Sequence, residues 1–87
     1  MISIFGTEWG KRTARGDIEQ YVSGIKGVTK NWAIGHLKFV MRFSRVRKDY
    51  LFQIMNEIET SPIYSHLQTS ECIIRLKNLR ERIKKEL

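Results

Sequence analysis

A glycine-marked break at residues 24–29, Gly-Ile-Lys-Gly-Val-Thr, separates two stretches that both carry a helical pattern. Glycine interrupts helices because it adopts backbone conformations that other residues disfavour, and Gly27 can take a positive φ without steric cost. The apolar residues that share one face before the break are Ile18, Tyr21 and Val22. This face predicts a first helix from about Thr13 or Asp17 to Ser23, with Asp17 able to cap its start. The chain is therefore expected to fold as helices joined by a tight turn.

The stretch after the break predicts a second helix, from Lys30 to about Phe43. Its apolar face, at the 3.6-residue period, comprises Ala33, Ile34, Leu37, Val40 and Met41. An adjoining aromatic stripe comprises Trp32, His36, Phe39 and Phe43. Because only a narrow strip through Asn31, Lys38 and Arg42 remains polar, we expect this helix to be largely buried, to expose mainly basic side chains and to form the centre of the fold.

The second helix is expected to end before the third begins. In an unbroken helix the apolar face would continue, but Lys48 would then lie on it, so a break at Ser44 to Lys48 is predicted. Asp49 can cap a third helix from Tyr50 to Glu59. Pro62 ends that helix within a short connector, Ser61 to Leu67.

A last helix is predicted from about Thr69 to Leu87. Its apolar stripe comprises Cys72, Ile73, Leu76, Leu79, Ile83 and Leu87. The predicted fold is all-α: a small helical domain with a helix-hairpin-helix of the helix-two-turns-helix type and a long C-terminal helix. Residues 1–87 are expected to form a single domain, in which residues 1–67 make the helix-hairpin-helix body and residues 68–87 the C-terminal helix. Met1 to Phe5 is expected to be short and extended at best.

The excess of positive over negative charge lies entirely in the first half of the chain. Residues 1–48 hold ten Lys and Arg and three Asp and Glu, a net charge of +7, whereas residues 49–87 hold six of each and sum to zero. A basic surface of this kind suits a polyanionic partner. At the hairpin, backbone amides at a helix start and the helix dipole favour a phosphate, and Lys26 and Lys30 flank Gly27.

The candidate RNA-binding residues fall into two basic surfaces. Around the hairpin we expect Lys11, Arg12, Arg15, Lys26, Gly27, Val28, Thr29 and Lys30, the bases neutralising phosphates and residues 27–29 presenting amides. The second basic surface comprises Lys38, Arg42, Arg45, Arg47 and Lys48. Contacts of both kinds would bind folded RNA through its backbone without reading its sequence.

Other classes of function are disfavoured by the sequence. A domain of 87 residues is too small for a deep substrate cavity, so neither an enzyme nor a small-molecule substrate is expected. His36 and His66 have no supporting ligand cluster, and Cys72 falls on an apolar stripe, so no catalytic residue, metal or cofactor is expected. Arg15-Gly16-Asp17 spells an adhesion tripeptide, but a helix cap is the simpler role for Asp17.

The location is expected to be inside a cell or an organelle. The single cysteine cannot form an internal disulfide. No apolar run approaches the roughly 20 residues of a membrane span, and Met1 to Phe5 leads into polar residues without a secretory signal, so no membrane partner is expected.

The order of several short segments resembles the small-subunit ribosomal protein thirteen family. Met-Ile-Ser-Ile-Phe-Gly, then Lys11-Arg12, then Tyr21-Val22 precede the hairpin, whose family pattern Gly-Ile-Gly-x-x-x-Ala is similar to Gly27, Val28, Thr29 and Ala33 here. Ser44 to Asp49 resembles the family's Thr-Arg-Val-Lys-Asp-Leu turn, and Tyr50 to Glu59 its third helix. Leu67 to Ile83 resembles the family's Leu-Arg-x-Glu-Val-x-x-x-Ile-Lys-Arg-Leu segment, with Arg75, Lys77 and Leu79 in or near register.

The resemblance implies a structural constituent of the small ribosomal subunit that binds rRNA in the subunit head during translation. It implies two protein partners, small-subunit protein nineteen as a neighbour and large-subunit protein five across the intersubunit bridge. Two departures stand out: Thr29 replaces the second hairpin glycine, and the family's Gly- and Arg-rich tail near P-site tRNA has no counterpart before Leu87. These departures favour a divergent member in the mitochondrial matrix, with a bacterial cytoplasmic ribosome as the alternative.

Two further functions were weighed against the ribosomal one. A small basic helical protein-interaction or inhibitor module, away from the ribosome, could use Trp32, Phe39 and Phe43 as a docking face, although such a stripe usually belongs to a core. A helix-turn-helix DNA binder is less well supported, because the expected burial of the second helix leaves no free recognition face.

Overall fold

The computed structural model describes residues 6–87, and every regular element in that range is helical. The helices are α1 (Thr7–Ser23), α2 (Lys30–Ser44), α3 (Lys48–Thr60), the 3-10 helix η1 (Pro62–Leu67) and α4 (Ser70–Glu86). The predicted all-α fold is thereby confirmed for the described residues. The expectation for Met1 to Phe5 lies outside them.

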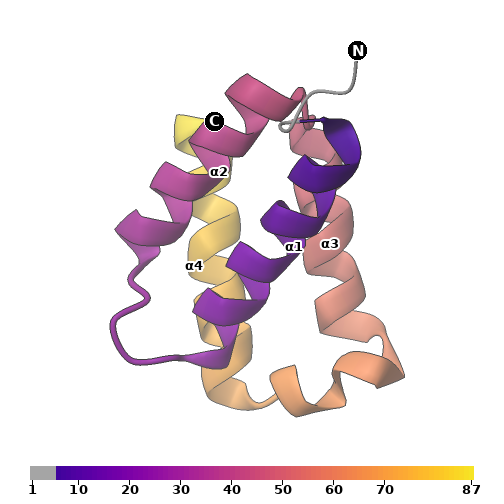
Figure 1. Ribbon diagram of the computed structural model, residues 1–87. Helices are drawn as coiled ribbons and strands as arrows, with labels where there is room; N and C mark the ends of the chain where they lie inside the picture. Colours follow the sequence, from indigo (N-terminus) through magenta and orange to yellow (C-terminus); the bar gives the residue numbers. More distant parts are fainter. Residues whose placement is uncertain (1–5) are drawn as a thin grey trace.

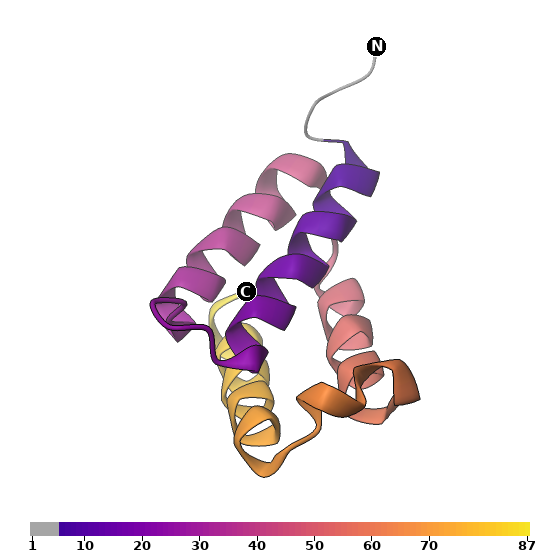
Figure 2. The same cartoon turned by 60° about the horizontal axis from the view of Figure 1, so that its bottom comes forward.

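The four α-helices run alternately down and up the molecule (Figures 1 and 2). α1 and α2 lie side by side and antiparallel, joined by the hairpin, while η1 links the lower ends of α3 and α4. α1 and α4 each pack against the other three α-helices, and α2 and α3 lie on opposite sides of them. The C-terminal helix is thus an integral part of the bundle.

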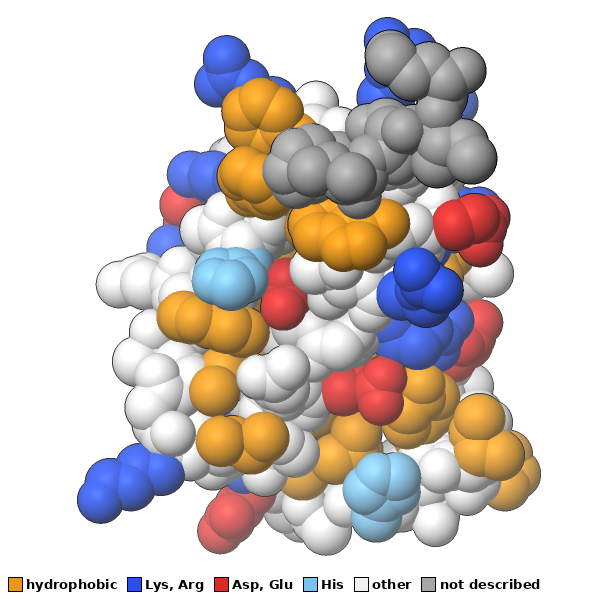
Figure 3. All heavy atoms as spheres, in the orientation of Figure 1, with side chains coloured by type: hydrophobic (Ala, Val, Ile, Leu, Met, Phe, Trp, Pro, Cys, Tyr) orange, Lys and Arg blue, Asp and Glu red, His pale blue; other side chains and the backbone are white. Residues whose placement is uncertain are grey.

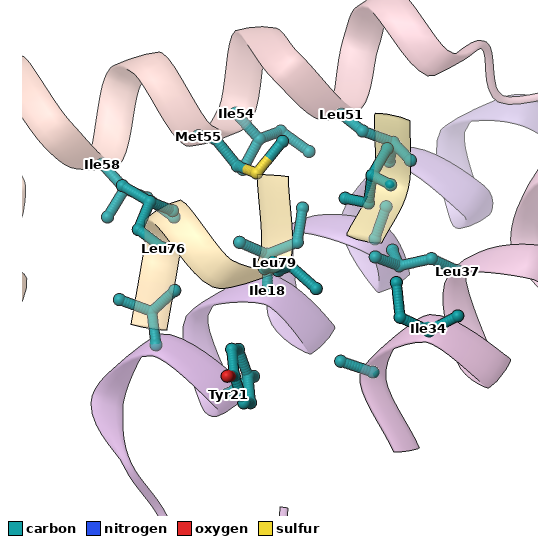
Figure 4. Close-up of a cluster of buried hydrophobic side chains, with 14 of the residues drawn as sticks. Ile18, Tyr21, Ile34, Leu37, Leu51, Ile54, Met55, Ile58, Leu76 and Leu79 are labelled. Atoms are coloured by element: carbon teal, nitrogen blue, oxygen red, sulfur yellow. The ribbon is translucent and has the colours of Figure 1, made fainter. Parts of the chain in front are cut away.

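One hydrophobic core joins all four α-helices (Figure 4). Its largest fully buried side chains are Ile18, Val22, Leu37, Val40, Leu51, Ile54, Met55, Ile58, Leu76, Leu79 and Ile83. Buried residues in each helix recur every three or four positions, as expected of amphipathic helices packed around a core. The predicted apolar stripe of α4 is confirmed, and Cys72 is a buried, free thiol within it.

α1 begins at Thr7, well before the predicted start, and its cap is Gly6. The prediction that Asp17 caps this helix was wrong: Asp17 lies in the middle of α1 and is 5% exposed. Gly10, which looks like a helix breaker in the sequence, is instead a buried contact point. A Cβ atom at Gly10 would lie 2.8 Å from Val46 Cγ2, closer than carbon atoms can approach.

α3 begins at Lys48, with Arg47 as its N-cap residue, so the predicted cap at Asp49 was also wrong. Asp49 lies in the first turn, where a carboxylate still interacts favourably with the helix dipole. The predicted break before Lys48 and the end of the helix next to Pro62 are confirmed. At α4, the Thr69 side chain accepts a hydrogen bond from the Cys72 amide at 3.3 Å and caps the helix.

Candidate nucleic-acid interface

The hairpin between α1 and α2 is built on two glycines with positive φ, Gly24 at 80° and Gly27 at 89°. Gly24 ends α1 in the left-handed conformation and donates its amide to the Tyr21 carbonyl at 3.1 Å. The Val28 amide then donates to the Ile25 carbonyl at 3.1 Å and closes the turn. The prediction of positive φ at Gly27 is confirmed, and the side of Gly27 where a Cβ would lie is open space.

Thr29, which replaces the second glycine of the resembling pattern, is the N-cap of α2. Its φ of −87° suits any L residue, and its hydroxyl oxygen accepts a hydrogen bond from the Trp32 amide at 3.0 Å. This bond satisfies one of the orphan amides of the first turn. The amides of Lys30 and Asn31 precede that turn's first intrahelical bond, so the hairpin end of α2 remains suited to an anion.

The basic residues expected around the hairpin do not gather there. Lys11 and Arg12 lie in the first half of α1, and at about 1.5 Å per residue roughly 20 Å of helix separates Lys11 from the turn. Lys11 Nζ lies 5.3 Å from the centre of the Tyr50 ring, on α3. Of the predicted hairpin cations, only Lys26 and Lys30 lie at the hairpin itself.

Arg15 is engaged inside the fold. Its Nη1 atom donates to Glu57 Oε2 at 2.7 Å and to the Tyr64 hydroxyl at 2.9 Å, which ties α1 to α3 and η1. The hydrogen bond from Arg15 lowers the pKa of Glu57, and the same bond raises the pKa of Arg15. Because its guanidinium already has two partners, Arg15 is better explained as a structural residue than as a phosphate contact.

A concentration of positive charge lies at the opposite end of α1 from the hairpin. There a cationic hollow of about 340 Å³ opens between the start of α1, the α2–α3 turn and the first turns of α3. Its lining comprises Thr7, Lys11, Arg45, Val46, Arg47, Asp49, Tyr50 and Gln53. The lining thus includes three cationic side chains and one carboxylate, that of Asp49. Arg47 Nη2 lies 4.0 Å from Asp49 Oδ2, and both side chains are more than four-fifths exposed. An exposed pair of this kind is weak, so the hollow stays positive.

The backbone of the α2–α3 turn explains how this hollow forms. Arg45 ends α2 in the left-handed conformation, with a φ of 54° and a ψ of 33°, which is uncommon outside glycine. Val46 is then buried against the core, and the two flanking arginines remain exposed. Lys48 Nζ donates to the Lys84 carbonyl at 3.3 Å, which brings the end of α4 close to the turn.

Lys38 and Arg42 both lie on α2 but have different partners. Lys38 Nζ lies 3.7 Å from Glu86 Oε1, so part of its charge is balanced by α4. The Arg42 guanidinium carbon lies 5.5 Å from the centre of the Phe43 ring and, within residues 6–87, pairs with no carboxylate. Arg42 is therefore the freer cation of the two.

An apolar groove of about 410 Å³, here called the aromatic groove, lies between α1 and α2. It is lined by Trp9, Thr13, Gly35, His36, Phe39 and Val40. Figure 3 shows hydrophobic side chains gathered over α2 and the adjacent part of α1, beside a histidine and a carboxylate. Phe39 is 42% exposed and Phe43 51%, so the prediction that α2 shows mainly basic side chains to solvent was wrong.

A carboxylate and a histidine meet beside this groove. Asp17 Oδ1 lies 3.6 Å from His36 Nδ1, and the His36 ring stacks on Trp32 with centroids 4.0 Å apart. Asp17 Oδ2 is buried and has no hydrogen-bond partner among residues 6–87. Burial raises the pKa of the Asp17 carboxyl, and the nearby His36 opposes that rise. Because Asp17 is buried, the adhesion tripeptide does not present its carboxylate at the surface.

Neither a metal site nor a membrane span is found in residues 6–87. No three His, Cys, Asp and Glu side chains there cluster as metal ligands. None of the helices in this range is long and apolar enough to cross a bilayer.

The comparisons with known proteins identify no relative. No family model, no curated protein and no solved structure matches this chain. The functional argument therefore depends on the geometry of the cationic hollow, the hairpin and the aromatic groove.

Several residues of these sites were not expected from the sequence. Tyr50 and Gln53 line the hollow one helical turn apart on α3, and Trp9 and Thr13 line the groove one turn apart on α1. These spacings, three residues on α3 and four on α1, were visible in the sequence, but Trp9 and Thr13 share a helix face only because α1 begins at Thr7.

Proposed function

We propose that this protein binds structured RNA through phosphate contacts centred on the cationic hollow. The observation that carries the proposal is the convergence of Lys11, Arg45 and Arg47, from two separate parts of the chain, on one concave surface with a single carboxylate. Flexible Lys and Arg side chains around a hollow neutralise several phosphates at once, and the released counterions favour binding. Arg12 and Lys48, next to Lys11 and Arg47 in the sequence, add further positive charge close to it.

The resemblance to small-subunit ribosomal protein thirteen suggests a setting for this activity. In that setting the chain is a structural constituent of the small ribosomal subunit, bound to rRNA in the head, with small-subunit protein nineteen and large-subunit protein five as neighbours. A mitochondrial ribosome is the proposed location and a bacterial one the alternative. The hairpin, with Gly27 at positive φ and Thr29 capping α2, is compatible with a second phosphate contact of the family's kind.

A salt titration with three variants tests the RNA proposal. We expect the affinity for a structured RNA to fall steeply with salt concentration, as it does when phosphates are neutralised by basic side chains. Lys11→Gln/Arg47→Gln should reduce the slope of log K against log salt by about 1 for each cation removed. Lys26→Gln/Lys30→Gln removes the same charge at the hairpin, and Lys77→Gln removes one charge from exposed α4.

The three variants separate the possible results. If the hollow is the main site, the hollow variant weakens binding more than the hairpin variant, and Lys77→Gln changes little. A larger effect of the hairpin variant would move the main contact to the hairpin. Absence of salt-sensitive RNA binding would reject the proposal, and failure to co-sediment with small subunits in high-salt gradients would reject its ribosomal form.

The exposed aromatic side chains favour a second candidate, a protein-interaction module. Contiguous apolar surface on a small protein often marks a docking site. This candidate predicts binding that survives high salt and does not need RNA. The same salt titration therefore discriminates the two functions.

A further inference from the structure

We propose that Tyr50 is a positioning residue for RNA binding: its ring holds the Lys11 ammonium group in the cationic hollow, where a phosphate can meet it. This inference rests on the proposed RNA binding and adds how one cation of the hollow is prepared for its ligand. Three features of the described residues support it: the contact between Lys11 and the ring, the way in which the ring itself is held, and the place of both residues in the hollow.

The contact between Lys11 and Tyr50 has the geometry of a cation–π interaction. Lys11 Nζ lies 5.3 Å from the centre of the Tyr50 ring. This distance is within the roughly 6 Å over which the negative face of an aromatic ring attracts an ammonium group. Lys11 pairs with no carboxylate in residues 6–87. In this part of the chain the Tyr50 ring is therefore the contact that attracts the charge of Lys11.

The Tyr50 ring is held from the core and from α1. Tyr50 is partly buried and packs against the hydrophobic core. Arg15 lies four positions after Lys11, one turn further along α1, and its bond to Glu57 fixes the guanidinium. The bond to Glu57 is the main cause of the raised pKa of Arg15, and hydrogen bonding to Tyr50 raises the same pKa further. The Tyr50 hydroxyl thus lies beside a fixed group, and the ring face is presented to Lys11.

Lys11 and Tyr50 line the hollow from different helices. Of the three cations in its lining, Arg45 and Arg47 come from the α2–α3 turn, and Lys11 comes from α1. A lysine side chain that is already held near its bound position loses less conformational entropy when a phosphate binds. A carboxylate could hold Lys11 equally well but would balance its charge, whereas the neutral ring leaves that charge available to RNA.

A double-mutant cycle tests the proposal. Tyr50→Leu keeps an apolar side chain but removes the ring, and should weaken binding of a structured RNA about two- to fivefold, the equivalent of one exposed cation–π contact. Tyr50→Phe keeps the ring and should retain most of the affinity. In a Lys11→Gln background Tyr50→Leu should have no further effect, because the cation that the ring holds is gone. Phe52→Leu makes the same change at a partly buried residue of α3 outside the hollow, and should leave binding unchanged.

Nuclear magnetic resonance of the free protein gives a readout that needs no RNA. An aromatic ring shields protons above its face, so the ε-methylene protons of Lys11 should resonate upfield of those of Lys77, which is exposed on α4. The upfield shift should persist in Tyr50→Phe and disappear in Tyr50→Leu. Far-UV circular dichroism of each variant confirms that the helices have formed.

The results distinguish this inference from the proposed function. If the Lys11 protons show no upfield shift, or if Tyr50→Leu binds RNA as tightly as the parent, the positioning role is rejected and salt-sensitive RNA binding stands. Equal weakening by Tyr50→Leu with and without Lys11 rejects it as well, and is the result expected if Tyr50 only supports the fold. If the parent protein shows no salt-sensitive RNA binding, both proposals fail, even where the upfield shift is present.

Discussion

Replacing Gly10 by alanine tests how the start of α1 is held against the α2–α3 turn. A Cβ at Gly10 would lie 2.4 Å from Ser44 Cβ and 2.8 Å from Val46 Cγ2, whereas carbon atoms pack at about 3.5–4.0 Å. Ser44 Cβ is bonded directly to the backbone, so the helix or the turn would have to move by about 1 Å. Overpacking of this kind typically costs about 1–3 kcal/mol.

Gly16 provides a matched control in the same helix. A Cβ at Gly16 would meet nothing within 4 Å, so Gly16→Ala should simply gain helix propensity, about 1 kcal/mol. Gly10→Ala gains the same propensity but pays the overpacking cost. The free energies of unfolding of the two variants should therefore differ by about 1–3 kcal/mol, with Gly10→Ala the less stable.

Urea denaturation and thermal unfolding followed by circular dichroism measure this difference. In a domain of this size 1 kcal/mol corresponds to about 4–8 °C in Tm, so the two midpoints should be separated by at least about 4 °C. Because the displaced turn carries Arg45 and Arg47, Gly10→Ala should also weaken RNA binding. If both variants stabilise the protein equally, the close approach of α1 to the turn is refuted.

Three smaller predictions concern the caps and the buried carboxylate. Thr29→Ala should reduce the free energy of unfolding by about 1 kcal/mol in urea denaturation, because the cap of α2 is lost; an unchanged midpoint would contradict this role. Arg45→Gly should raise stability by about 1 kcal/mol by relieving the positive φ, yet weaken RNA binding, whereas Arg45→Ala should only weaken binding. Burial raises the pKa of the Asp17 carboxyl, so the folded protein holds the Asp17 proton more readily than the unfolded chain does. The contribution of protonated Asp17 to the free energy of unfolding is therefore lost as the pH rises through the folded pKa. Asp17→Asn should therefore be more stable than the parent at neutral pH, and the gain should shrink toward acid pH; a gain that grows in acid would have the wrong sign.

The helical architecture could be predicted from local patterns in the sequence. Apolar residues at a 3.6-residue period located α2 and α4, and Gly24 and Gly27 located the hairpin because their φ angles are those that glycine favours. Lys48 on the extended apolar face correctly required a break before α3. These signals arise from residues that are close together in the sequence, so they can be detected in a single sequence.

The start of α1 could not be predicted in the same way. The predicted helix began only at about Thr13 or Asp17, because its apolar face was read from Ile18, Tyr21 and Val22, and Gly10 lowers the helix propensity of the residues before it. Gly10 is tolerated because its missing side chain lets α1 pack closely on Ser44, a tertiary contact with a residue far along the chain. Because the predicted helix began after Trp9, the sequence did not indicate that Trp9 lines the aromatic groove.

The grouping of charges also depended on the tertiary fold. Counting residues located the whole positive excess in the first half of the chain, but assigned Lys11 to the hairpin. The structure places Lys11 beside Arg47 at the other end of α1 and commits Arg15 to Glu57. Likewise, Phe39 was expected in the core because the sequence of an aromatic stripe does not show whether a neighbouring helix covers it. In the structure Phe39 is exposed.

The position of the RNA contact is measured most directly by nuclear magnetic resonance. A structured RNA titrated into ¹⁵N-labelled protein should shift the amide signals of Lys11 and of the turn from Arg45 to Lys48, and added salt should reverse the shifts. Small or no shifts are expected at Lys77 on the exposed face of α4. Shifts confined to the hairpin, or spread over α4, would contradict the account, because they would place the RNA away from the cationic hollow.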